Sequence, residues 1–82
     1  MKLPRDLSAA DLEKALRRAF SYQFSRQVGS HRRLTTHTGG EHHLTIPNHD
    51  PLRTGTLRAI LGEVMAHHRL TLEQVLEQLG IA

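Results

Sequence analysis

Residues 22–47 read YQFSRQVGSHRRLTTHTGGEHHLTIP, and the spacing of apolar residues in this stretch decides the fold. Tyr22, Phe24 and Val28 alternate with polar residues, which predicts a half-buried first strand. Gly29-Ser30 interrupts the alternation, as a turn or a bulge does. The beginning of the stretch therefore predicts a strand followed by a sharp change of direction.

Two more strands are expected after this turn. One spans 31–37, and the other spans 42–47, where Pro47 ends the pairing because it has no N–H group to donate. Between them, residues 38–41 read TGGE, which predicts a hairpin turn because glycine tolerates the positive φ that tight hairpins need. The whole stretch thus predicts a three-stranded antiparallel meander.

Apolar residues at helical spacing flank the meander on both sides. A first helix is expected from Ser8, which has the capping-box spacing to Asp11, and a second helix opens at 54–56. A last short helix begins at Thr71, with Gly80 as its C-terminal stop. The order α-β-β-β-α with a short extra C-terminal helix predicts an α+β fold whose helices pack on one face of the sheet. This order resembles the double-stranded-RNA-binding-domain (dsRBD) architecture.

The composition excludes several classes of protein. At 82 residues the chain is expected to form one domain, 1–82, with a surface site and no room for a deep small-molecule pocket. It has no cysteine, which excludes a disulfide framework and a thiolate zinc site. No apolar run approaches the roughly 20 residues that span a bilayer, and no signal peptide is visible. We therefore expect no membrane association and a cytoplasmic location.

Basic residues are concentrated in the first two thirds of the chain. Residues 1–58 carry ten Lys/Arg and five Asp/Glu, whereas residues 59–82 carry one Arg and three Glu. Residues 14–40 contain six basic residues and no acid. This distribution indicates a surface for a polyanion, most economically nucleic acid, although a solvated basic surface would show the same composition.

The parity of the strands predicts which side chains share the uncovered face of the sheet. If Leu34 points to the helices, the alternate residues of its strand point away from them, and so do two residues of the third strand. These residues are His31, Arg33, Thr35, His37, His43 and Thr45. Imidazole, guanidinium and hydroxyl groups on one face can bind phosphate and move protons near neutral pH.

His31 is the leading candidate for chemistry. It follows Gly29-Ser30, where the backbone can approach a ligand closely, and it precedes Arg32-Arg33. Cleavage of RNA needs a base for the 2′-OH proton and positive charge for the phosphate, and a histidine flanked by arginines meets both needs. On these residues alone, a surface or structural histidine is the alternative.

The other histidines do not predict a metal site. His42-His43 and His67-His68 are adjacent pairs whose side chains diverge in a strand or a helix, and no ligand spacing such as H-x-x-x-H is present. We therefore expect no metal and no cofactor. His67 and His68 are expected to be solvated residues at a helix end, where histidine is mildly favoured.

Four short motifs occur in order along the chain. Residues 26–31 read RQVGSH, which matches an R-Q-x-G-S-H signature, and residues 2–5 read KLPR. LTIPNH at 44–49 and GTLRAIL at 55–61 complete the series. At this spacing the four segments resemble the HicA-type mRNA-interferase toxins of type II toxin–antitoxin systems, over essentially residues 2–65.

The resemblance implies a dsRBD-like fold and the cleavage of mRNA by a metal-independent endoribonuclease. It implies that the histidine of the G-S-H motif, His31, is catalytic, and we assign to it the role of general base. It also implies a HicB-type antitoxin as the inhibiting partner. With mRNA as substrate, the expected RNA-binding residues are Arg26, Ser30, Arg32 and Arg33, and Ser30 can either orient His31 or bind phosphate.

The residues alone leave three alternatives. His49 is a further candidate for the second proton carrier, but it can equally cap the loop before Pro51. A non-catalytic module that binds double-stranded RNA would keep the basic surface and give His31 no necessary role. A protein-binding domain, for which the charge asymmetry is incidental, is the third hypothesis.

Overall fold

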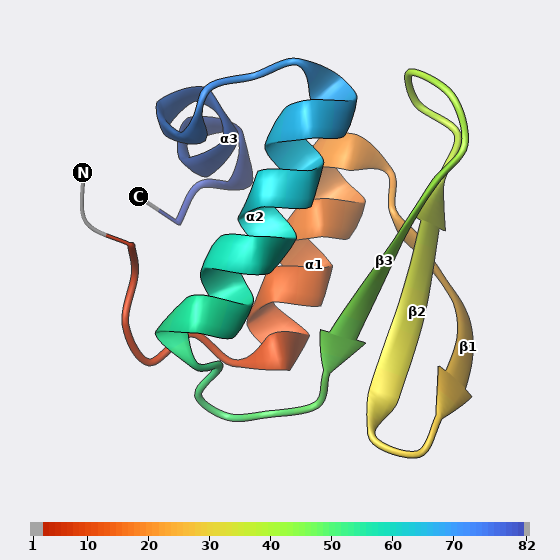
Figure 1. Ribbon diagram of the computed structural model, residues 1–82, viewed down its shortest axis with the longest axis vertical. Helices are drawn as coiled ribbons and strands as arrows, with labels where there is room; N and C mark the ends of the chain where they lie inside the picture. Colours follow the sequence, from red (N-terminus) through yellow and green to blue (C-terminus); the bar gives the residue numbers. More distant parts are fainter. Residues whose placement is uncertain (1–2, 82) are drawn as a thin grey trace.

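The predicted order of elements is confirmed in residues 3–81, which are those that the computed structural model describes. The elements are α1 (Ala9–Phe20), β1 (Gln23–Val28), β2 (His31–Thr36), β3 (His42–Pro47), α2 (Thr54–His68) and α3 (Leu72–Leu79). In Figure 1 the helices lie together on one side of the sheet. This arrangement confirms the predicted α+β architecture.

The sheet has the predicted meander order β1-β2-β3, with both pairs antiparallel. β2 and β3 pair in continuous register, so that Leu34 lies opposite Leu44. Gly39 and Gly40 in the turn between them have φ of 70° and 104°, the left-handed region that the hairpin needs and that glycine adopts without strain. The β1–β2 pair differs, because its register shifts between Phe24 and Arg26, where β1 carries one extra residue.

The core forms where the helices cover β3 and the adjoining part of β2. Leu34, Leu44 and Ile46 point from the sheet into this layer and are fully buried. The buried helical residues in the same cluster include Leu12, Leu16, Leu57, Leu61, Val64, Val75, Leu76 and Leu79. Each apolar side chain of this size contributes roughly 1.5–3 kcal/mol on burial, so this layer supplies most of the favourable free energy of folding.

β1 is an edge strand that lies beyond the reach of the helices (Figure 1). All six of its residues are exposed, with Phe24 46% and Val28 65% accessible. Only Tyr22, which directly precedes β1, is buried in the core. The prediction of a half-buried first strand is therefore wrong for β1, because the helices pack over β3 and leave the β1 side of the sheet uncovered.

Local sequence signals set the ends of two helices. The Ser8 hydroxyl accepts the N–H of Asp11 at 3.0 Å, and Thr71 and Gln74 form a reciprocal capping box. Each such cap contributes about 1 kcal/mol. α2 begins after Arg53, whose side chain makes no capping hydrogen bond. Within residues 3–81, no helix combines the length and the apolar character that crossing a membrane requires.

His67 and His68 pack against other residues, so the expectation that they are solvated is wrong. The hydroxyl of the buried Tyr22 lies 2.8 Å from His42 Nδ1 and 2.9 Å from His68 Nε2. A hydroxyl has one proton, so Tyr22 donates to one ring and accepts an N–H from the other. His68 also packs against the ring of Phe20, with the ring centroids 4.5 Å apart.

His67 ties the β2–β3 turn to the end of α2. Its Nε2 lies 3.0 Å from the carbonyl oxygen of Thr38 and 3.1 Å from that of Gly40. Because both partners are carbonyl oxygens, Nε2 carries the proton and donates to them. The His67 ring stacks on that of His42, with centroids 4.3 Å apart and planes 8° from parallel. We call Tyr22, His42, His67 and His68 the histidine cluster.

Packing in the histidine cluster shifts the pKa of three of its members. Burial, reinforced by the neighbouring His67, lowers the pKa of His42 and of His68 below the ordinary 6.5. Burial, with a smaller effect of the Glu63 carboxylate, raises the pKa of Tyr22 to about 12. The folded protein therefore resists both protonation of these two histidines and ionisation of the tyrosine.

The protein is expected to lose stability as the pH falls below about 6.5. The unfolded chain binds protons at His42 and His68 with their ordinary pKa, whereas the folded chain binds them only at lower pH. Their stabilising contribution is thus present above the unfolded-state pKa and is lost as the pH falls through the lower folded-state pKa. Urea unfolding between about pH 7 and about pH 5 measures this slope.

His68→Gln should make the dependence of the free energy of unfolding on pH less steep, because it removes one of the two groups. His37→Gln, which replaces an exposed histidine just after β2 and outside the histidine cluster, is the matched control and should change the slope less than His68→Gln does. Equal slopes in His68→Gln and the parent would contradict this explanation.

Candidate functional site

His31 is the first residue of β2 and follows the tight turn at Gly29-Ser30. Its cross-strand neighbours are Val28 on β1 and Pro47 on β3. The residue is exposed, and within residues 3–81 its side chain has no hydrogen bond or ion pair. Both ring nitrogens are therefore available to a ligand or to a proton.

The bulge in β1 decides which residues accompany His31. Across the bulge, Arg26 pairs with Arg33, and Val28 pairs with His31. Directly opposed residues of an antiparallel pair share a face, and so do residues two apart in one strand. His31, Arg33 and Arg26 thus lie together on the face turned away from the helices, which we call the open face. The extra residue, Ser25, donates its hydroxyl to the Arg33 carbonyl at 3.0 Å.

Arg26 and Arg33 form a pair of like charges. Directly opposed like charges destabilise an antiparallel sheet. Among residues 3–81 neither guanidinium has a carboxylate within ion-pair distance or a hydrogen bond from its side chain. The open face beside His31 therefore has positive charge that the described part of the chain does not neutralise.

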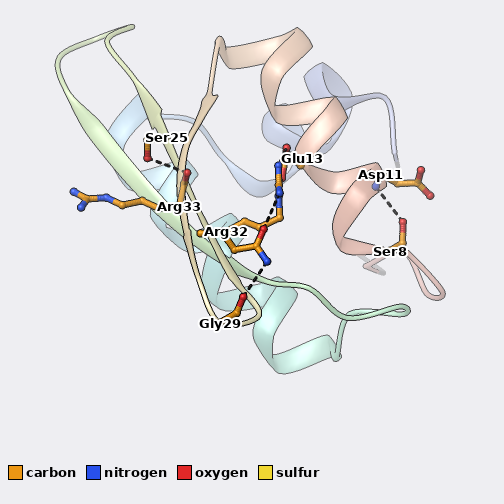
Figure 2. A network of polar contacts seen from close by, with 8 residues as sticks. Ser8, Asp11, Glu13, Ser25, Gly29, Arg32 and Arg33 are labelled. Carbon is orange, nitrogen blue, oxygen red and sulfur yellow. Dashed lines mark hydrogen bonds and ion pairs between the residues drawn. The ribbon is translucent and has the colours of Figure 1, made fainter.

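Arg32 points to the opposite side of the sheet from Arg33, toward α1 (Figure 2). Its Nε and Nη2 donate to the two carboxylate oxygens of Glu13 at 2.7 and 3.0 Å, and its Nη1 donates to Gln27 Oε1 at 3.1 Å. The hydrogen bond to Glu13 raises the pKa of Arg32 further above its ordinary value. The structure thus brings together three of the predicted site residues, His31, Arg26 and Arg33, and separates Arg32 from them.

Ser30 lies in the turn and is exposed, and its hydroxyl makes no hydrogen bond within residues 3–81. Its carbonyl oxygen accepts the N–H of Asn48 at 2.8 Å, which holds the turn against the loop after β3. Sequence reasoning did not single out Asn48. Its place in the LTIPNH segment was the only indication, because a hydrogen bond made by the backbone does not depend on which residue type is present.

His49 follows in the same loop, and two backbone hydrogen bonds fix its position. Its N–H donates to the Pro47 carbonyl at 2.8 Å, and its carbonyl accepts from Ala9 N–H at 2.9 Å. The side chain is exposed. The chain therefore presents a second imidazole on the loop that is bonded to the His31 turn, while its side chain stays open to solvent.

His43 lies on the open face as parity predicts, opposite Thr35 on β2. Its Nδ1 accepts from the Thr35 hydroxyl at 2.8 Å, and its Nε2 donates to Glu41 at 3.1 Å. Both ring nitrogens are thus engaged, unlike those of His31. In residues 3–81 no group of three His, Asp or Glu side chains is placed to hold a metal ion.

Arg33→Gln is expected to raise the free energy of unfolding by roughly 0.2–1 kcal/mol at low salt, because it removes the repulsion with Arg26. Salt screens exposed charges, so the gain should fade at about 1 M salt. Urea unfolding at both salt concentrations measures it, with Arg58→Gln on the surface of α2 as the control. A loss of stability in Arg33→Gln, or a gain in the free energy of unfolding that is the same at both salt concentrations, would contradict the repulsion between Arg26 and Arg33.

Comparison with known proteins places the chain in a family. The family model described as the HicA toxin of bacterial toxin–antitoxin matches residues 9–64. A search of curated proteins and a search of solved structures gave no match. The family match covers more than half of the chain and includes α1, all of the sheet and the turn that carries His31. The chain therefore belongs to the HicA toxin family of bacterial toxin–antitoxin systems, whose members are known as RNases.

Proposed function

We propose that this HicA-family chain is an endoribonuclease toxin that cleaves mRNA with His31 as general base. One observation carries the proposal: His31, with no side-chain partner in residues 3–81, shares the open face with the opposed cations Arg26 and Arg33. A phosphodiester supplies an anion for these two guanidinium groups, and RNA supplies a 2′-OH for the base. Imidazole is the side chain that most often serves as a general base in enzymes.

The proposed reaction is an internal transfer of the phosphoryl group. His31 takes the proton of the 2′-OH, the 2′ oxygen bonds to the neighbouring phosphorus, and the bond from phosphorus to the 5′ oxygen breaks. The products are a 2′,3′-cyclic phosphate and a 5′-OH. Arg26 and Arg33 donate to the non-bridging oxygens and stabilise the charge that develops there.

The leaving 5′ oxygen needs a proton from a second group. His49 is the candidate within the chain, because its loop is bonded to the His31 turn through Asn48 and Ser30. In this proposal Ser30 contacts the phosphate through its exposed hydroxyl and does not orient His31, to which it makes no bond. Arg32, which Glu13 engages, is not a ligand of the scissile phosphate.

His31→Ala is expected to reduce RNA cleavage by at least about 10²-fold, because a general base is lost. The side chain is exposed and makes no hydrogen bond or ion pair within residues 3–81, so circular dichroism and the melting temperature should stay parental. His37→Ala, which replaces an exposed histidine just after β2, is the matched control and should cleave normally. Cleavage by His31→Ala at the parental rate would refute the assignment. A non-catalytic RNA-binding module instead predicts that neither the parent nor His37→Ala cleaves RNA.

Cleavage is expected to continue in EDTA, because every proposed step uses imidazole or guanidinium groups of the chain. The 5′ fragment should end in a 2′,3′-cyclic phosphate, which mass spectrometry distinguishes from a 3′-OH. If EDTA stopped the reaction and a divalent metal restored it, the proposed mechanism would be wrong.

Membership of the family implies a cognate antitoxin. We propose that a HicB-type antitoxin covers the open face and presents carboxylates to Arg26 and Arg33, since complementary potentials speed encounter and select the partner. Hydrogen exchange of the co-expressed complex should show protection over residues 26–33 relative to the free toxin. Protection confined to α3, with residues 26–33 as exposed as in the free chain, would exclude direct occlusion.

A further inference from the structure

The six basic residues between 14 and 40 fall into two groups. Arg18 and Arg32 are engaged within the fold: Arg18 donates to the Leu79 carbonyl at 3.1 Å, and Arg32 is paired with Glu13. The other four make no ion pair and no side-chain hydrogen bond among residues 3–81, and they are Lys14, Arg17, Arg26 and Arg33. The proposed active site uses two of these four, which leaves a second unneutralised pair on α1.

Lys14 and Arg17 lie three residues apart, so they occupy the same face of α1. This face borders a surface pocket of about 470 Å³ between α1 and β2. The pocket is lined by Ala10, Glu13, Lys14, Arg17, Arg32 and Asn48. We call it the α1 groove. It lies on the helix side of the sheet, across from the open face.

The charge of the α1 groove favours an anion. Glu13 is the only acid among the described residues that line it. Both carboxylate oxygens of Glu13 accept from Arg32, so this side chain does not oppose a second negative group. Glu13 is also only 13% exposed. Arg32 uses three of its five N–H donors on Glu13 and Gln27, which leaves two for a ligand. Lys14 and Arg17 add two cations that no carboxylate of the described chain neutralises.

The α1 groove is connected to the His31 turn. Asn48 lines the groove, and its N–H bonds to Ser30, the residue before His31. Beside the groove, the guanidinium of Arg32 lies 4.1 Å from the centre of the Phe24 ring, and Phe24 is 46% exposed. Aromatic rings of this kind stack with nucleobases of single strands. Cations together with an exposed ring fit a nucleic-acid strand better than a purely acidic peptide.

We propose that the α1 groove is a second RNA-binding site, in which Lys14 and Arg17 bind the phosphates of the strand beside the bond cleaved at His31. The strand passes the turn at Gly29-Ser30 from the groove to the open face. Phe24, backed by Arg32, gives a base of this flanking segment a surface for stacking. This proposal rests on the proposed function, since it takes RNA to be the substrate.

The test uses the full chain carrying His31→Ala, so that RNA is bound and not cleaved. In this background, Lys14→Gln/Arg17→Gln should weaken binding of a single-stranded RNA roughly 10- to 30-fold at about 0.1 M salt. The salt slope, which is the change in the logarithm of the binding constant with the logarithm of the salt concentration, should fall in magnitude by about 1.4, because about 0.7 is lost for each of two phosphate contacts. Arg53→Gln/Arg58→Gln, the α2 control, removes the same charge from the N-cap and the first turns of α2 and should change both quantities less. Circular dichroism checks that each variant is folded.

Phe24→Leu should weaken binding several-fold without changing the salt slope, because stacking releases no counterions. With His31 restored, Lys14→Gln/Arg17→Gln should raise the KM for RNA more than it lowers kcat. Equal affinity and salt slope in Lys14→Gln/Arg17→Gln and the α2 control would overturn the proposal that the α1 groove binds RNA. Unchanged RNA binding with weakened binding of the antitoxin would assign the groove to a protein partner and overturn it as well.

The two proposals fail separately. If the parent cleaves RNA and depends on His31 while the groove variant binds like the α2 control, the catalytic proposal stands and the groove falls. If the parent does not cleave RNA but the groove variant loses affinity and salt slope, the binding site stands and the catalytic proposal falls.

Discussion

One extra residue in β1, Ser25, determines which side chains share each face of the sheet. In an unbroken register from Phe24 and Leu34, Arg26 would lie opposite Arg32 on the helix side. The bulge moves Arg26 opposite Arg33 and aligns Val28 with His31. Bulges are known to re-aim side chains near functional sites. Here the bulge assembles an imidazole and two guanidinium groups on the open face, and the Ser25 hydroxyl bond to the Arg33 carbonyl holds the shifted register.

On the helix side of the sheet, the ion pair between Glu13 and Arg32 determines how Arg32 is used. Consecutive residues of a strand point to opposite sides, so Arg32 and Arg33 meet different surroundings. Arg32 is 30% exposed, and a fork of two hydrogen bonds to Glu13 compensates its charge. Arg33 has no such partner among residues 3–81. The contact also joins β2 to α1, and both of its residues line the α1 groove.

The sequence predicts the parts of the fold that depend on local chemistry. Gly39 and Gly40, the caps at Ser8 and Thr71, and the alternation around Leu34 indicate the elements and their order, because each acts within a few residues. The sequence does not predict that β1 is exposed, because this depends on how far the helices extend across the sheet. Of the candidate site, the turn and His31 follow from the motif, but the separation of Arg32 from Arg33 and Arg26 requires the register. The histidine cluster was missed because its contacts join residues distant in sequence.

Stability and binding make opposite demands on the open face. A small domain has a margin of only about 5–15 kcal/mol, and yet Arg26 and Arg33 oppose each other without a neighbouring acid in the described chain. An acid beside them would relieve the repulsion, but it would also occupy the guanidinium groups, as Glu13 occupies Arg32. Leaving them unpaired keeps them available to an external anion. By the same electrostatics, an antitoxin that presents carboxylates gains an attraction that the toxin itself does not satisfy. In the proposed mechanism one pair of cations therefore serves both substrate and inhibitor, which makes their binding mutually exclusive.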